Sequence, residues 1–143
     1  MTPTQVLAVQ RTFALVMPIK EQAAAMVYAR VFETDPGLKA MFRGDIKDQE
    51  KKLMSALAIV ITGLARPESI ISAVEELGAK HADYGVRDRD YDTVAGALLW
   101  TLEMGLGSEF TPEVKDAWVA AYTYLASIMK RAARTANSHA RAI

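Results

Sequence analysis

Apolar residues recur along this chain at spacings of three and four, the period of one face of an α-helix. Three stripes are clearest: Leu53, Ala56, Leu57, Val60 and Leu64; Val94, Leu98, Leu99 and Leu102; Val114, Trp118, Ala121, Tyr122, Leu125 and Met129. No segment of the sequence alternates apolar and polar residues as a strand does, and no Asn-Gly or Asp-Gly hairpin signal occurs. The pattern predicts an all-α fold.

Prolines and glycines divide the pattern into elements. Each proline can be placed at or near the first turn of a helix, where its missing N–H costs nothing, and Thr2, Asp35 and Thr111 each supply an N-cap before one. We predict seven helices: Pro3 to about Val16, Pro18 to about Glu33, a short turn at Pro36–Phe42, Ile46 to Ala65, Pro67 through His81, about Tyr91 to Leu106, and Pro112 to about Arg134. They form one domain, 1–143, and the small polar residues of about 134–143 are expected to fray.

Length and composition narrow the class of protein. The 143 residues suit one domain with one core, and equal numbers of cationic and anionic side chains (17 each) give no electrostatic affinity for nucleic acid or anionic lipid. The absence of cysteine excludes disulfides, iron–sulfur clusters and a thiolate-ligated haem. The N-terminus does not read as a secretory signal, and the longest apolar run, Leu53–Ala65, is too short to span a bilayer. We expect a cytoplasmic protein without a nucleic-acid or membrane partner.

His81 is the most informative single residue. Counting back from it gives Leu77, Val74 and Ile70, so the imidazole lies at the end of an apolar helical stripe and faces the interior. A buried nitrogen base needs a partner, since burying it unpaired costs roughly 1–3 kcal/mol. A backbone carbonyl is the more common partner, and a metal or haem iron is the alternative.

Two further polar side chains lie on apolar stripes. Gln49 precedes Leu53 on one stripe, and Tyr28 lies on the stripe that runs from Ala24 to Phe32. An inward glutamine, tyrosine and histidine can converge on a single cavity.

Taken in order, these residues resemble the globin family over roughly residues 4–134. The sequence is most similar to the globin domain of bacterial flavohaemoglobins and to single-domain bacterial haemoglobins. The resemblance is carried by Tyr28, Asp35-Pro36, Phe42, the run Asp48 to Leu53, Leu77-Gly78, the run His81 to Val86, Tyr91, Ala117-Trp118 and Tyr122. It implies a globin fold, with about seven helices around a haem pocket.

The resemblance implies haem b, with His81 as the proximal ligand of its iron. The second ring nitrogen should donate to a backbone carbonyl or to water. Phe42 would pack flat on the porphyrin, and Lys52 and Lys80 would pair with its propionates, although either lysine can equally be a solvated surface residue. The remaining haem contacts that the resemblance implies are Leu53, Leu57, Leu77, Val86, Tyr91 and Val94.

On the distal side, the resemblance places Tyr28 and Gln49 against the ligand. Both side chains can donate to the partial negative charge of bound O₂, with Tyr28 dominant, and Leu53 and Leu57 would limit ligand movement. In the family, such a pocket accompanies reaction of O₂ with nitric oxide to give nitrate. The expected function is therefore nitric oxide detoxification by dioxygenation.

Two departures from the family pattern leave the enzymatic activity uncertain. The chain ends at Ile143 without flavin and nucleotide domains, so turnover would need an external reductase. The family's proximal glutamate, eleven residues after Tyr122, is replaced by Ala133, which should make the imidazole less anionic. The alternatives are a protein that binds, stores or delivers O₂ without turnover, a gas sensor that acts through a partner, and a globin that has lost haem.

Overall fold

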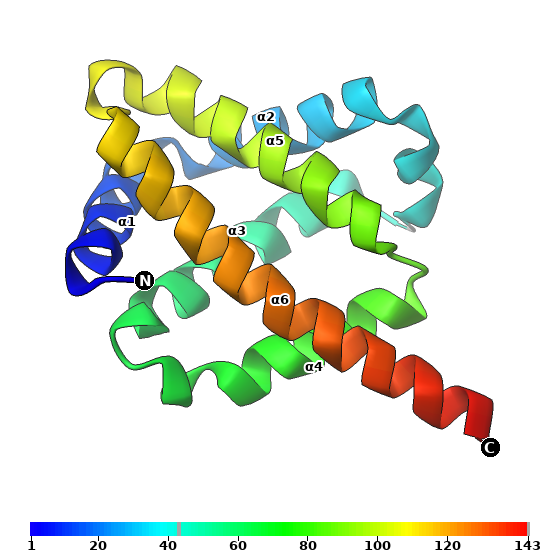
Figure 1. Ribbon diagram of the computed structural model, residues 1–143. Helices are drawn as coiled ribbons and strands as arrows, with labels where there is room; N and C mark the ends of the chain where they lie inside the picture. The colour runs from blue at the N-terminus through cyan, green and yellow to red at the C-terminus, as the bar shows by residue number, and fades with distance from the viewer. Residues whose placement is uncertain (43, 143) are drawn as a thin grey trace.

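The structure, a computed structural model, describes residues 1–42 and 44–142, and the side chains of these residues as far as 136. Six α-helices and no strand occur in this part of the chain (Figure 1). The helices are α1 (Pro3–Val16), α2 (Lys20–Thr34), α3 (Ile46–Thr62), α4 (Ile71–Asp83), α5 (Asp88–Leu106) and α6 (Pro112–Ala142). The shorter 3₁₀ turns are Met17–Ile19, Pro36–Met41, Gly63–Ala65, Pro67–Ser69 and Gly107–Glu109. The all-α prediction is confirmed.

Side-chain caps begin the elements where the sequence predicted them. The Thr2 hydroxyl accepts from the Gln5 N–H at 3.1 Å, and the Asp35 carboxylate accepts from the Gly37 N–H at 3.2 Å. The Thr111 hydroxyl likewise accepts from the Val114 N–H at 3.2 Å. Each bond satisfies one of the donors that the first turn of a helix leaves free, so it stabilises the start of the element.

Three predicted boundaries were wrong. Pro67 opens a 3₁₀ turn, and the histidine helix α4 begins only at Ile71. Helix α5 begins at Asp88 and not at Tyr91, because the Asp90 carboxylate accepts from the Arg87 N–H at 2.8 Å and caps the helix one turn earlier. Helix α6 continues to Ala142, beyond the predicted end near Arg134. The expected fraying of 134–143 concerns a segment whose side chains beyond 136 lie outside the described residues.

Two groups of buried side chains form the core. The larger group joins side chains from all six helices, and it includes Trp118, whose indole N–H donates to the Thr12 hydroxyl at 2.9 Å. The smaller group consists of Val27, Val31, Leu38 and Ala97, between α2, the turn after it and α5. Burial of these apolar surfaces provides most of the driving force for folding.

The helix packing determines where polar side chains can meet. Helix α6 crosses α4 closely, and α2 crosses α5 (Figure 1). By contrast, α3 and α4 hardly contact each other within the described part of the chain. Gln49 on α3 and His81 on α4 therefore belong to two helices that other elements hold apart. No helix among the described residues is long and apolar enough to cross a membrane.

Candidate functional site

Tyr28 and Gln49 lie together, although 21 positions separate them in the sequence. The Tyr28 hydroxyl, on α2, donates to the backbone carbonyl oxygen of Gln49, on α3, at 3.4 Å. Both side chains are half-buried. At this length the hydrogen bond is weak. It is made to the backbone of Gln49, and the Gln49 side-chain amide does not bond to Tyr28. The hydroxyl can therefore turn toward another acceptor at small cost.

The Tyr28 hydroxyl is a neutral donor. Burial, with a smaller contribution from the negative charge of nearby Glu50, raises its pKa to about 12. The group keeps its proton throughout the physiological pH range. A protonated tyrosine can donate one hydrogen bond, which is the property that a ligand bearing negative charge requires.

Three aromatic rings pack together beside this pair. The Tyr28 ring centre lies 5.3 Å from that of Phe42 in an edge-to-face arrangement and 6.1 Å from that of Phe32. Phe32 and Phe42 also pack edge to face at 5.4 Å. Sequence reasoning selected Tyr28 and Phe42 but missed Phe32, although its spacing of four from Tyr28 on one helical face was a usable signal.

The histidine has one nitrogen committed. His81 Nδ1 lies 2.7 Å from the backbone carbonyl oxygen of Leu77, one turn earlier on α4. A carbonyl can only accept, so Nδ1 carries the proton and Nε2 keeps its lone pair. The pKa of His81 lies below its ordinary value of 6.5, because the effect of burial, which lowers it, is larger than the effect of this hydrogen bond, which raises it. The ring is a neutral base at pH 7, as a metal ligand must be.

Tyr91 lies beside the histidine and has an unpaired hydroxyl. The two ring centres are 6.3 Å apart and the rings are inclined by 29°. Among the described residues, the Tyr91 hydroxyl is the buried side-chain polar atom without a hydrogen-bond partner. The Tyr91 backbone carbonyl, in contrast, accepts from the Tyr122 hydroxyl at 2.6 Å.

Helix α6 brings a cation to Tyr91. The Lys130 ammonium lies 5.5 Å from the centre of the Tyr91 ring, while Ala133, three residues further, contributes no polar group. The sequence singled out Ala133 but missed Lys130. This side of the candidate site therefore carries a positive charge on α6.

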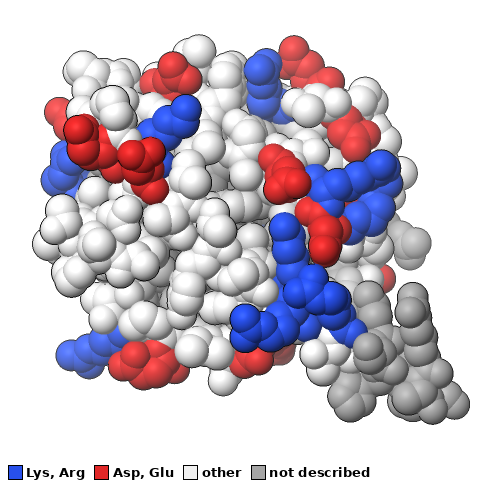
Figure 2. Space-filling view, viewed as in Figure 1, with Lys and Arg blue, Asp and Glu red and all other residues white. Residues whose placement is uncertain are grey.

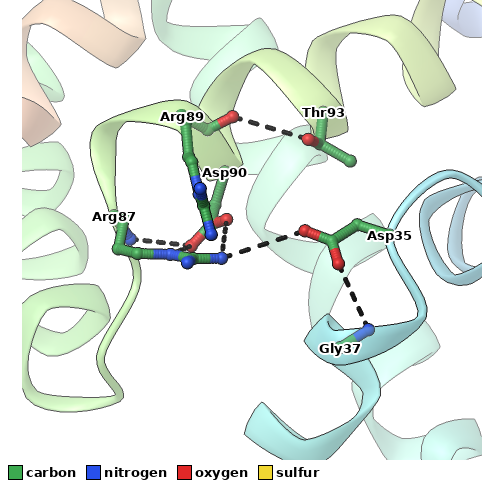
Figure 3. Close-up of polar contacts among 6 residues, drawn as sticks. All are labelled: Asp35, Gly37, Arg87, Arg89, Asp90 and Thr93. Atoms are coloured by element: carbon green, nitrogen blue, oxygen red, sulfur yellow. Dashed lines mark hydrogen bonds and ion pairs between the residues drawn. The ribbon is translucent and has the colours of Figure 1, made fainter.

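An ion network joins the segment after His81 to the turn that leads to Phe42. Figure 3 shows Arg87 between two carboxylates. Its Nη2 atom lies 3.0 Å from Asp90 Oδ1 and 3.8 Å from Asp35 Oδ2. The sequence did not point to this network. Asp90 is only 3 % exposed, and Arg87 donates to it from its backbone and its side chain. The backbone N–H of Val86 also donates to the His81 carbonyl at 3.0 Å, which orders the residues between the two.

The other predicted contacts are dispersed around these side chains. The lysines are exposed, and Lys80 pairs with Glu76 at 3.6 Å. Leu53 and Val94 pack on the smaller core group, and Leu57 packs on the larger one. Leu77 and Val86 are half-buried near His81 in the chain.

The cavities described in the structure do not coincide with the predicted haem contacts. A small cavity of about 20 Å³ has Leu57 in its wall and no other predicted contact. A larger groove of about 360 Å³ lies between α5 and α6, and none of the predicted contacts lines it.

The residues nevertheless fit a haem in their donor chemistry. His81 offers a single neutral nitrogen, Nε2, whose opposite ring nitrogen is already bonded to a carbonyl, the arrangement that metal-bound histidines share. The unpaired Tyr91 hydroxyl beside it is a buried donor without an acceptor in the described chain. Equally, the bond from His81 to Leu77 is what an ordinary core histidine makes.

Comparison with known proteins identifies the relatives. The family model described as "Globin" matches residues 25–129. A flavohemoprotein of Xylella fastidiosa is 35 % identical over 108 residues, covering 73 % of this chain and 27 % of its own length. Those of Rhizobium meliloti and Rhodopirellula baltica are each 32 % identical, over 105 and 117 residues, and cover 71 % and 80 % of this chain. The chain spans 26–29 % of the length of these three relatives.

Proposed function

The chain belongs to the globin family, and from this premise we propose that it oxidises nitric oxide to nitrate with O₂. Family membership and the flavohemoprotein relatives imply haem binding and the binding of small gases such as O₂. The observation that carries the finer proposal is the contact between Tyr28 on α2 and Gln49 on α3, at 3.4 Å. It brings two neutral hydrogen-bond donors together on one side of the molecule.

In this proposal His81 holds the haem through Nε2. Phe42 and the leucines and valines that the sequence selected provide its apolar contacts, and Lys52 and Lys80 pair with its carboxylates. The proposal takes this haem to be haem b, which supplies, when bound, an iron that accepts a diatomic gas and exchanges one electron. Tyr91 borders His81, and its unpaired hydroxyl is available to a polar edge of the group.

The distal residues stabilise negative charge and exclude water. O₂ gains partial negative charge when it binds, and Tyr28 donates to it because its pKa of about 12 keeps the hydroxyl protonated. The Gln49 amide supplies a second donor. The adjacent rings of Phe32 and Phe42, together with Leu53 and Leu57, keep the surroundings apolar, which strengthens both bonds.

The overall reaction requires one electron per turnover: NO and O₂ combine with it to give nitrate. None of the residues named above is a redox cofactor, so the electron comes from a reductase outside these 143 residues. The relatives are named flavohemoproteins, a name that joins a flavin to a haem. We propose a flavin-dependent reductase as the donor for this chain.

A second candidate function is O₂ binding without turnover. It is favoured by the proximal side, where α6 presents Lys130 at 5.5 Å from the Tyr91 ring and Ala133 in place of a carboxylate. A nearby cation makes the imidazole a weaker electron donor. This would favour retention of O₂ over its activation.

Stopped-flow mixing of the oxygenated protein with NO separates the two. The mix is followed by repeated NO additions in the presence of NADH and a cell extract, and a parallel series omits the extract. Repeated NO loss with stoichiometric nitrate, only when extract is present, supports dioxygenation served by a reductase. A single turnover that ends at the ferric protein in both series supports O₂ binding. Failure to form an oxygenated protein contradicts both.

A further inference from the structure

A groove of about 360 Å³ runs between α5 and α6, and Tyr28, Gln49 and His81 do not line it. Its apolar lining includes Leu98 and Leu99 from α5 and Trp118, Val119 and Ala126 from α6. The volume lies at the lower end of the range for small-molecule sites, roughly 300–1,000 Å³. The proposed gas chemistry does not use this groove.

Charge is concentrated at one end of the groove. Lys130, Arg131 and Arg134 all line it from the C-terminal half of α6, and Asp92 is the carboxylate that lines it from α5. Figure 2 shows Lys and Arg side chains gathered over this part of α6, beside a broad surface without charge. Three cations and one anion leave this end positive, and an apolar groove with a positive end suits a ligand with an apolar body and an anionic head.

The cations are available to a ligand. Arg131 is exposed, and Arg134 pairs with Asp88 at 3.6 Å between two side chains that are 65 % and 66 % exposed. Such an exposed pair contributes little in water, so an anion in the groove can replace it. Val119, which is 41 % exposed, leaves apolar surface uncovered next to these charges.

We propose that the α5–α6 groove binds an amphipathic carboxylate, with its apolar chain along Leu99, Val119 and Ala126 and its head group at Lys130 and Arg131. The apolar chain of the bound carboxylate covers the apolar lining and removes it from water. Its head group meets the cations where the groove opens to solvent. A purely apolar ligand would offer no partner to the cations, and a purely ionic ligand would leave the apolar lining exposed to water.

The groove shares two residues with the surroundings of His81. Tyr122 and Lys130 line it, and both also contact Tyr91. The Tyr122 hydroxyl donates to the Tyr91 carbonyl at 2.6 Å, and the Lys130 ammonium lies over the Tyr91 ring. Tyr91 in turn lies beside His81. If His81 ligates haem, as proposed above, a carboxylate that draws Lys130 away from Tyr91 changes the charge next to the ligand. Occupancy of the groove should then alter gas affinity.

The test is calorimetric titration of the ferric, cyanide-ligated protein with decanoate, because cyanide prevents a carboxylate from occupying the iron. We expect saturable binding of one decanoate, and binding of decanol at least about tenfold weaker, since a neutral head gains nothing from the cations. Arg131→Glu, which reverses an exposed charge in the groove, should weaken decanoate binding at least about fivefold. Thr123→Trp, which fills the groove from its exposed rim, should abolish it. Lys115→Glu, an exposed α6 residue outside the groove, is the matched control and should change affinity less than about twofold.

Equal decanoate affinity in wild type, Arg131→Glu and Thr123→Trp would overturn the proposal. Decanol that binds as tightly as decanoate would also overturn it. So would a stable dimer that Thr123→Trp dissociates but decanoate does not dissociate, because the groove would then be occupied by a second copy of this chain. The O₂ dissociation rate of the ferrous protein at saturating decanoate tests the link to His81: we expect a change of at least about twofold. Binding in the groove without any change in that rate removes the link, and it leaves the proposed gas chemistry untouched.

Discussion

The two sides of the candidate site hold their polar groups differently. On one side, the Tyr28 hydroxyl makes one long hydrogen bond, 3.4 Å, to the Gln49 backbone. On the other side, His81 Nδ1 makes a short one, 2.7 Å, within its own helix. A long bond is easily exchanged for another, whereas a short bond within a helix holds a ring in one orientation. The molecule thus combines adaptable donors with a fixed base.

The backbone shows the same contrast. Helix α4 lies so close to α6 that a Cβ added at Gly78 would lie 2.6 Å from the Met129 Cα atom and nearer still to the Met129 carbonyl oxygen. Gly78 is one turn before His81, so the helix that carries the base is held directly against a neighbour. Tyr28 and Gln49 instead meet through one long hydrogen bond between a side chain and a backbone carbonyl.

The largest expected effect is the loss of haem on removing the fixed base. His81→Ala should abolish stoichiometric haem binding, because α4 carries no second imidazole to replace Nε2. The measurement is the Soret absorbance per protein after reconstitution. The control is His139→Ala, which changes the other histidine of the chain and should retain haem. A full Soret band in His81→Ala would refute the ligand assignment.

The close packing of α4 on α6 can be broken without touching a polar group. Gly78→Ala places a Cβ against Met129 and should lower the free energy of unfolding by about 1–3 kcal/mol. Gly96→Ala is the matched control, since its Cβ meets nothing within 4 Å, and it should raise that free energy by about 0.4–1 kcal/mol. Urea denaturation measures both. Equal effects of the two substitutions would mean that α4 can move away from α6 freely.

Tyr28→Phe tests the adaptable side. It should raise the O₂ dissociation rate at least about tenfold, because a charge-assisted hydrogen bond in a dry site is worth roughly 1.5–3 kcal/mol. Gln49→Leu should raise the rate less. Flash photolysis or stopped-flow displacement of O₂ by CO measures both rates. An unchanged rate in Tyr28→Phe means that the hydroxyl does not face the ligand, and a larger effect of Gln49→Leu reverses the order of the two donors.

Tyr91 and Tyr122, which lie next to each other, differ in the hydrogen bonding of their hydroxyl groups. Tyr91→Phe removes a hydroxyl that has no partner in the described chain and should raise the free energy of unfolding of the haem-free protein by about 1 kcal/mol. Tyr122→Phe removes the 2.6 Å bond to the Tyr91 carbonyl and should lower it by about 1 kcal/mol. If both substitutions destabilise alike, the Tyr91 hydroxyl has an acceptor after all.

The smallest expected effect is on pH dependence. Burial lowers the pKa of His81 in the folded protein below 6.5, so below about pH 6.5 the unfolded chain binds more protons at this residue than the folded protein does. The haem-free protein should therefore lose stability as pH falls from about 6.5 through the folded pKa, and gain nothing at this residue above pH 7. Urea midpoints at pH 7.5 and 5.5 should differ more in wild type than in His81→Gln. Equal differences would show that His81 is not the group responsible.

The spacing of apolar residues, the prolines and the N-caps by themselves determined the all-α class and most helix limits, because these features act within a few residues of the chain. The same periodicity placed Tyr28, Gln49 and His81 on inward faces. The predicted helix starts at Pro67 and Tyr91 and the predicted end near Arg134 were wrong, because the structure has a 3₁₀ turn, a carboxylate cap and a longer helix at these places.

Only the tertiary structure decided which of these side chains meet. The packing of α6 against α5 brings Lys130 to Tyr91, and the crossing of α2 and α3 directs the Tyr28 hydroxyl to a backbone oxygen rather than to the Gln49 side chain. The groove between α5 and α6 and the bridge from Arg87 to Asp35 arise in the same way. The reason is physical: helical periodicity determines which face a residue occupies, whereas the partner across that face depends on how complete helices pack.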